Sequence, residues 1–156
     1  MRIGALLMPT GKTSAADPDP PVPPGRRLLS WMPALAGMAA IFYASSLPGS
    51  EINLPAFPHS DKLAHFLAYF ALGWLISLRH FLQRRRPFHL DFLGIAVGAL
   101  YGIGDEIHQI FVPFRDFSFL DMLADGLGAA AACRVYGAFF GSGRRAGDHP
   151  GGGTGS

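Results

Sequence analysis

Four long apolar stretches, separated by short polar segments, occupy the middle of the chain. They cover about residues 28–47, 61–82, 90–112 and 117–140, and the first contains no charged residue. A helix needs about 20 mostly apolar residues to cross the roughly 30 Å hydrocarbon core of a bilayer. The pattern therefore predicts four transmembrane helices, arranged as an all-α integral membrane four-helix bundle.

The two ends of the chain are polar and rich in Gly, Pro and Ser. Residues 1–25 and 141–156 cannot bury enough apolar surface to fold, so we expect a disordered N-terminal segment and a flexible tail on either side of a membrane domain of residues 26–140. An alternative for the N-terminal end is a cleaved secretory signal, with Arg26 and Arg27 before the first apolar run. That run is longer than the roughly 7 to 15 apolar residues of such signals, which favours a membrane span.

Composition supports the same class of protein. Only 15% of the residues are charged, compared with about 25% in a typical soluble domain, and the mean hydropathy is +0.26. The single cysteine, Cys133, excludes a disulfide-stabilised scaffold. These figures argue against a water-soluble enzyme with one compact core.

The basic residues indicate how the predicted spans are oriented, because cytoplasmic loops of membrane proteins are enriched in Lys and Arg. Eleven of the 13 basic residues lie in the two ends of the chain or near the loop between the second and third spans, whereas Lys62 and Arg115 lie on the other side. We therefore expect both termini in the cytoplasm, in a multi-pass protein of the inner (plasma) membrane. The arginine run at 84–86 is then a topological marker, and no nucleic-acid partner is expected.

Polar residues within the last three predicted spans collect near the outer membrane face. At a rise of 1.5 Å per residue they lie within roughly 6 to 12 Å of that face. Ionisable groups at such depths are costly and are functional candidates by default. The candidate binding residues are Asp61, Lys62, His65, Tyr69, Asp105, Glu106, Gln109, Arg115, Asp121 and Asp125, and the candidate catalytic residues are Glu106, His65 and His108.

Rows of small residues predict which helix faces pack together. Membrane helices approach closely along such rows, so we expect the third and fourth spans to pack tightly, with Glu106 facing inward. The same faces could instead join two copies of the chain in a homo-oligomer. The rows are Gly94, Gly98, Gly102 and Glu106 in the third span, and Ala124, Gly128 and Ala132 in the fourth.

Two segments of the sequence resemble the VanZ-like family of small polytopic membrane proteins. They are PHSDKLAHFLAYFALG, residues 58–73, and GALYGIGDEIHQIFVPFRDFSFLDMLADGLGA, residues 98–129. The resemblance implies a four-helix membrane fold and a link to the cell envelope, because the first member of the family is associated with low-level resistance to the glycopeptide teicoplanin. It implies no particular reaction. The small residue common in the family between Pro113 and Arg115 is Phe114 here, which disfavours a turn that needs a positive φ.

Two chemical roles for the polar cluster follow from its residue types. A metal site would draw its nitrogen and oxygen ligands from His65, Glu106, His108, Asp121 and Asp125. No compact metalloprotease motif is present, and the sequence identifies no metal or cofactor. Alternatively, Glu106 could form an acid–base pair with either histidine, which would make the protein an enzyme.

Two further roles involve the basic residues Lys62 and Arg115. Both could join the acids in a salt-bridge network that only holds the helices together, in a non-catalytic structural or interaction protein. Both could instead bind a phosphate or carboxylate, in a pocket for a lipid headgroup or a cell-wall precursor. We therefore expect an outward-facing polar site that binds or modifies an envelope component and affects glycopeptide susceptibility, with the structural role as the alternative.

Two predictions concern basic residues outside this cluster. Arg79 is expected to extend its side chain outward to the membrane surface at the end of its span. His80 is assigned to a loop and given no role.

Overall fold

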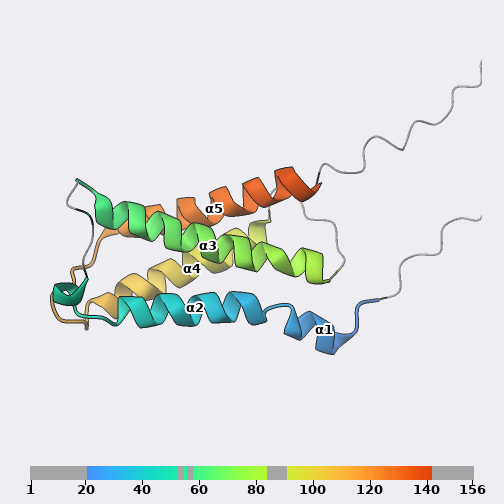
Figure 1. Cartoon of the computed structure of the whole chain (residues 1–156), viewed down its shortest axis with the longest axis horizontal. Coiled ribbons are helices and arrows are strands. Elements are labelled where there is room, and N and C mark those ends of the chain that lie inside the picture. The colour runs from blue at the N-terminus through green and yellow to red at the C-terminus, as the bar shows by residue number, and fades with distance from the viewer. Residues whose placement is uncertain (1–20, 53–54, 56–57, 84–90, 142–156) are drawn as a thin grey trace, which may run out of the picture.

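The computed structural model describes residues 21–52, 55, 58–83 and 91–141, and these form helices and no strand. Helices α2 to α5 lie lengthwise beside one another in an elongated bundle (Figure 1). The all-α prediction is therefore confirmed. In chain order the elements are α1 (Pro24–Leu29), α2 (Met32–Ser45), the 3-10 turn η1 (Gly49–Glu51), α3 (Ser60–Leu82), α4 (Phe92–Gln109) and α5 (Phe119–Gly141).

The first predicted stretch is divided between two helices. The proline ring nitrogen of Pro33, at the start of α2, has no hydrogen to donate to the preceding turn, so the helix is interrupted at Ser30 and Trp31. Taken together, Pro24–Ser45 is the one helical stretch among the described residues that is long and apolar enough by itself to cross a membrane. Helices α3, α4 and α5 each carry charged residues within their length.

The predicted polar ends lie mostly outside the described residues. Residues 1–20 and 142–156 are not described, and neither is the arginine run at 84–86. One boundary was wrong: α1 begins at Pro24, inside the segment of residues 1–25 that was expected to be disordered. Proline is well suited to the first turn of a helix, where its missing N–H costs nothing.

Two polar side chains cap the helices that follow the loops. The Asp91 carboxylate accepts a hydrogen bond from the Gly94 N–H at 3.1 Å and begins α4. The Ser118 hydroxyl accepts one from the Asp121 N–H at 3.3 Å, directly before α5. Each satisfies one of the backbone donors that a helix leaves free at its start.

Glycines bring α5 very close to two neighbouring helices. The Gly98 face of α4 meets Ala129, which confirms tight packing of these helices along the predicted row. The Gly128 face does not meet α4 as expected, because it lies against the backbone of α3 at Phe66 and Phe70. On the α3 side, a Cβ added at Gly73 would lie 2.8 Å from the Ala129 carbonyl oxygen. Both predicted rows therefore pack within one chain.

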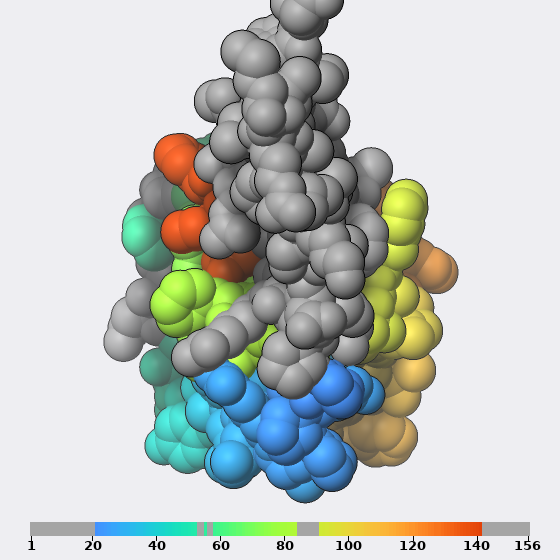
Figure 2. All heavy atoms as spheres, turned by 90° about the vertical axis from the view of Figure 1, so that its right-hand side faces the viewer, coloured from blue at the N-terminus to red at the C-terminus, as the bar shows by residue number. Residues whose placement is uncertain are grey.

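The bundle has two ends, each formed by different elements (Figure 1). The α1 helix and the last turns of α5 lie at one end (Figure 1), which Figure 2 shows face on. The start of α3, the end of α4 and η1 lie at the other end. A buried apolar cluster of Ala34, Tyr69, Leu72 and Ile76 joins α2 and α3 between them. The candidate site lies at the η1 end.

Candidate functional site

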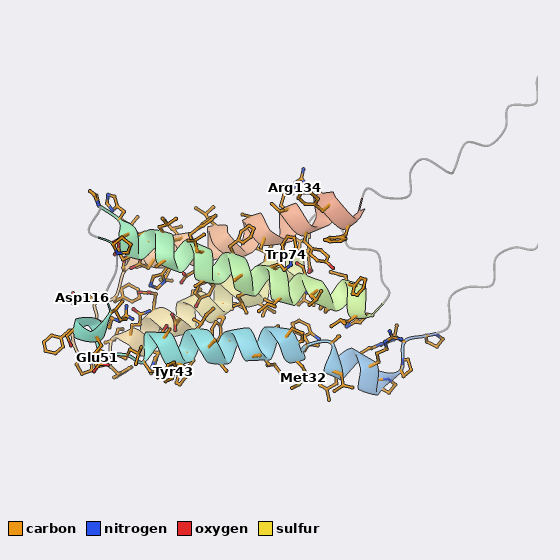
Figure 3. All side chains as sticks on the ribbon, in the orientation of Figure 1. Met32, Tyr43, Glu51, Trp74, Asp116 and Arg134 are labelled. Carbon is orange, nitrogen blue, oxygen red and sulfur yellow. The ribbon has the colours of Figure 1, made fainter. Side chains whose placement is uncertain are left out.

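Three helices and a loop bring the predicted polar residues to the η1 end of the bundle. They are the first turns of α3, the last turns of α4, the first turns of α5 and the connection from α4 to α5. Glu51 in η1 and Asp116 in the connection mark this end in Figure 3, whereas Arg134 lies toward the other end. Successive helices run antiparallel (Figure 1). Residues that are far apart in sequence therefore lie at the same level, near the η1 end of the bundle.

The centre of the site is a contact between His65, Glu106 and Asp125, one from each of α3, α4 and α5. The His65 Nδ1 atom lies 3.0 Å from Asp125 Oδ1 and 3.9 Å from Glu106 Oε1. Both acids are fully buried, and Glu106 faces inward as predicted. The Ser118 N–H donates to Glu106 Oε2 at 2.9 Å. We call these three residues the His65 triad.

A second group connects the starts of α3 and α5. The Lys62 ammonium donates to Asp61 at 2.8 Å and to Asp121 at 2.9 Å. Asp121 is buried, whereas about half of the Asp61 side chain is exposed. Lys62 therefore joins two helices through an ion pair that lies partly within the bundle.

A third group connects α4 to α2. Asp105 accepts hydrogen bonds from Ser45 Oγ at 2.8 Å and from Gln109 Nε2 at 3.2 Å. His108 lies 3.0 Å from Ser46 Oγ and stacks on the Phe42 ring. Of the two histidines considered as partners for Glu106, the structure brings His65 to it and directs His108 toward α2.

Arg115 does not join the network of acids. Its guanidinium donates to the carbonyl oxygens of Leu47 at 3.4 Å and Ala44 at 3.3 Å, and it forms no ion pair within the described residues. Of the two roles left open for Arg115, the salt bridge to the acids is therefore absent among the described residues, and the guanidinium caps the end of α2, where carbonyl groups lack partners. The preceding residue, Phe114, has a positive φ of 59° despite its bulk. The turn that Phe114 was expected to disfavour is therefore present.

Four buried polar atoms of the site have no hydrogen-bond partner within the described residues. They belong to a tyrosine of α3, two acids of α4 and one acid of α5. Orphaned buried groups are rare in folded proteins and indicate a ligand, a proton or water. The atoms are Tyr69 Oη, Asp105 Oδ1, Glu106 Oε1 and Asp125 Oδ2.

A pocket of about 530 Å³ runs beside this cluster between α2 and α3. Most of its wall is apolar, formed by small and aliphatic side chains such as Ala40, Ala68 and Leu75. One end is polar instead. The polar lining residues are Ser45, Asp61, His65, Tyr69, Asp105, Gln109 and Arg115.

Access to the pocket is from the side of the bundle. Ala40 and Ala44, on its α2 wall, are exposed. The volume is within the range of about 300 to 1,000 Å³ that is usual for small-molecule sites. The pocket thus offers an apolar groove that ends at ionisable groups.

A buried polar group at the opposite end of the bundle was missed by sequence reasoning. Arg79 Nη2 lies 2.6 Å from Asp91 Oδ1, and His80 Nε2 lies 3.0 Å from Asp91 Oδ2. The Arg79 guanidinium also lies 5.0 Å from the centre of the Trp31 ring. Arg79 is therefore buried rather than extended outward, and His80 belongs to α3 rather than to a loop. The available signal was Asp91, an acid directly before an apolar stretch, which is typical of a helix cap.

Comparison with known proteins identifies the family. A family model described as VanZ/LLP1 matches residues 27–140. An uncharacterized protein of the fission yeast Schizosaccharomyces pombe is 33% identical over 98 residues, which cover 63% of this chain and 59% of the yeast protein. The match thus spans somewhat more than half of that relative's length, and no solved structure matches the chain. Because the family model covers α2 to α4 and all but the last residue of α5, and with them the polar site, the chain belongs to the VanZ/LLP1 family.

Proposed function

We propose that the chain is a four-span protein of the inner (plasma) membrane, with both termini in the cytoplasm, and that it binds an amphipathic component of the cell envelope. The binding site is the pocket between α2 and α3. The bound component is a lipid or a lipid-linked cell-wall precursor, with its polar part against the ionisable end of the pocket.

The outer surfaces of the helices support a membrane location. Leu67 on α3, Leu100 on α4 and Leu127 on α5 are each more than half exposed, and so are Phe81 and Phe139. Large apolar side chains exposed on all sides of a bundle are favourable in lipid and costly in water. Helices α3 and α5 each have 23 residues, or about 35 Å at 1.5 Å per residue, which is sufficient to cross a bilayer.

The composition of the pocket is the observation that carries the proposed ligand. Its apolar wall suits an acyl or isoprenoid chain, since burial of each methylene contributes about 0.8 kcal/mol. At its polar end, Arg115 is the cation without an ion-pair partner among the described residues. An arginine in this setting binds phosphate or carboxylate well. Binding or modification of such a component in the outer leaflet would alter susceptibility to a glycopeptide such as teicoplanin.

The pocket can be tested by filling it without touching a polar group. In Ala40→Trp the indole enters the apolar part of the pocket, whereas in the control Ala39→Trp it occupies an exposed position of α2 outside the lining. Native mass spectrometry of the purified chain then measures the lipid that remains bound. We expect wild type and Ala39→Trp to retain lipid equally, and Ala40→Trp to lose most of it together with any effect on teicoplanin susceptibility.

The structural alternative is favoured by one contact, the bridge from Lys62 to Asp61 and Asp121. If the polar cluster only holds the helices together, Ala40→Trp leaves the phenotype intact, because it changes no polar contact. Equal lipid retention in both tryptophan variants would count against the pocket proposal, and so would a phenotype that survives in Ala40→Trp.

A further inference from the structure

The polar end of the bundle carries more buried carboxylates than cations that neutralise them. Asp105, Glu106 and Asp125 are at most 5% exposed, and within the described residues no Lys or Arg forms an ion pair with any of them. Lys62 is already shared by Asp61 and Asp121. Unpaired buried carboxylates are costly, so this arrangement calls for compensation by protons on the acids or on His65, or by a bound cation.

The His65 triad is the part of the cluster with the geometry of a ligand set. One donor atom from each of the three side chains lies within 4.8 Å of the other two. Glu106 Oε1, which has no hydrogen-bond partner, points toward His65 Nδ1 at a distance of 3.9 Å. An unpartnered oxygen of a fully buried acid thus faces the space between the three residues, and this observation is independent of the number of acids nearby.

We propose that His65, Glu106 and Asp125 bind one divalent transition-metal ion of the Zn²⁺ or Mn²⁺ type. Imidazole nitrogen with carboxylate oxygen is a donor set that these ions accept. The ion adds two positive charges where the acids lack a counter-charge. Because the ligands come from α3, α4 and α5, it also joins the three helices at the level of the pocket.

The surroundings of the triad hold two of its ligands in place. The Ser118 N–H donates to the second oxygen of Glu106 and so orients the carboxylate. A Cβ added at Gly102 would lie 2.9 Å from Asp125 Oδ2, so the glycine leaves the space that this carboxylate occupies. Such support around metal ligands is typical of metal sites, and its loss usually weakens affinity about 10- to 100-fold.

Direct metal binding tests the proposal. The full chain is purified in detergent, treated with a chelator and titrated with ZnCl₂ or MnCl₂ by calorimetry, and bound metal is counted by elemental analysis. We expect one ion per chain and a melting temperature that rises with metal concentration. Glu106→Gln and His65→Ala should each weaken affinity by about 100-fold or more, since loss of a ligand exceeds the loss of a supporting contact. Glu51→Gln, an exposed acid at the same end, should bind as wild type does.

Specific outcomes would overturn the metal site. The proposal is contradicted if the wild-type chain binds neither Zn²⁺ nor Mn²⁺ in the titration. It is also contradicted if Glu106→Gln binds the metal with unchanged affinity. A shared proton in place of the metal predicts no metal binding at all and no loss of stability in Glu106→Gln. If a variant of a fully buried ligand fails to accumulate, the partly exposed His65 still decides the outcome through His65→Ala. Ala40→Trp, which is expected to lose the bound lipid, should still bind the metal as wild type does, so failure of the metal site is distinguishable from failure of the pocket.

Discussion

Asp91 accepts three hydrogen bonds at the start of α4, from Arg79, His80 and the Gly94 N–H. Asp91 is buried, as are both side chains that donate to it. Its carboxylate therefore compensates the buried guanidinium and begins the helix at the same time. Removal of one partner of such a pair leaves the other charged group without compensation, which is more costly than loss of an exposed pair.

Asp91→Ala should therefore destabilise the protein by about 3–5 kcal/mol. The control Asp116→Ala removes an exposed acid of the α4–α5 connection and should change stability by less than about 0.5 kcal/mol. Reversible denaturation in mixtures of SDS and mild detergent measures both free energies of unfolding. Equal effects of the two substitutions would mean that the Arg79 pair contributes little.

At the scale of single residues, sequence reasoning identified polar side chains but not their partners. Glu106 was expected to face inward and does so. Arg115 could have paired with the acids or with a bound anion, yet it caps α2, because a guanidinium with five donors binds whichever acceptors the fold brings to it. Phe114 adopts a positive φ, although the propensity of a bulky residue argues against that conformation.

At the scale of helices, close approach of α3 and α5 depends on the absence of a side chain at Gly128. The position faces the backbone of Phe66 and Phe70, where a Cβ does not fit. Gly126, two residues earlier on the same helix, has nothing within 4 Å of an added Cβ. The two glycines therefore differ in environment but share the helix and its intrinsic propensities.

Gly128→Ala should lower stability by about 1–3 kcal/mol, because the methyl group forces two backbones apart. Gly126→Ala should leave stability unchanged or raise it by up to about 1 kcal/mol, through the higher helix propensity of alanine. Thermal unfolding in detergent, followed by circular dichroism, compares them. If Gly128→Ala were more stable than wild type, the backbones of α3 and α5 would have to be far enough apart at this position to admit a methyl group.

The helix boundaries themselves were largely readable from the sequence, because apolar stretches of this length have few alternatives to helix. Predicted stretches of residues 61–82 and 117–140 correspond to α3 and α5 within two residues at each end. The interruption at Ser30 and Trp31 was not predicted, although Pro33 was its signal. The choice of neighbour for each small-residue row was also not predictable, since periodicity defines a face but not what packs on it.

At the scale of the whole molecule, the proposed topology places the two ends of the bundle on opposite sides of a membrane. Ser50, in η1, and Gly25, in α1, are both exposed and lie at opposite ends. Cys133 is buried between α3 and α4 and is the chain's single native cysteine. A cysteine introduced at either end of the bundle can thus show which side of the membrane that end faces, because the buried Cys133 should react little with the label.

In intact cells, Ser50→Cys should react with a membrane-impermeant maleimide, and Gly25→Cys should react only after the cells are lysed. The expected contrast follows from the excess of basic residues at the α1 end, which favours the cytoplasm. Labelling is measured on gels as the increase in apparent protein mass that attachment of the maleimide causes. Labelling of Gly25→Cys in intact cells would reverse or refute the proposed orientation.

The sequence by itself determined that the chain is helical, where its apolar stretches lie, and that its polar residues fall at matching depths of successive helices. These properties depend on local composition and on the fixed rise of a helix. Only the tertiary structure decided that His65 meets Glu106 and Asp125, that His108 turns toward α2, and that Arg79 is buried with Asp91. Such pairings depend on the rotation of each helix about its axis and on which neighbour it faces, and both are set by packing between residues far apart in the chain.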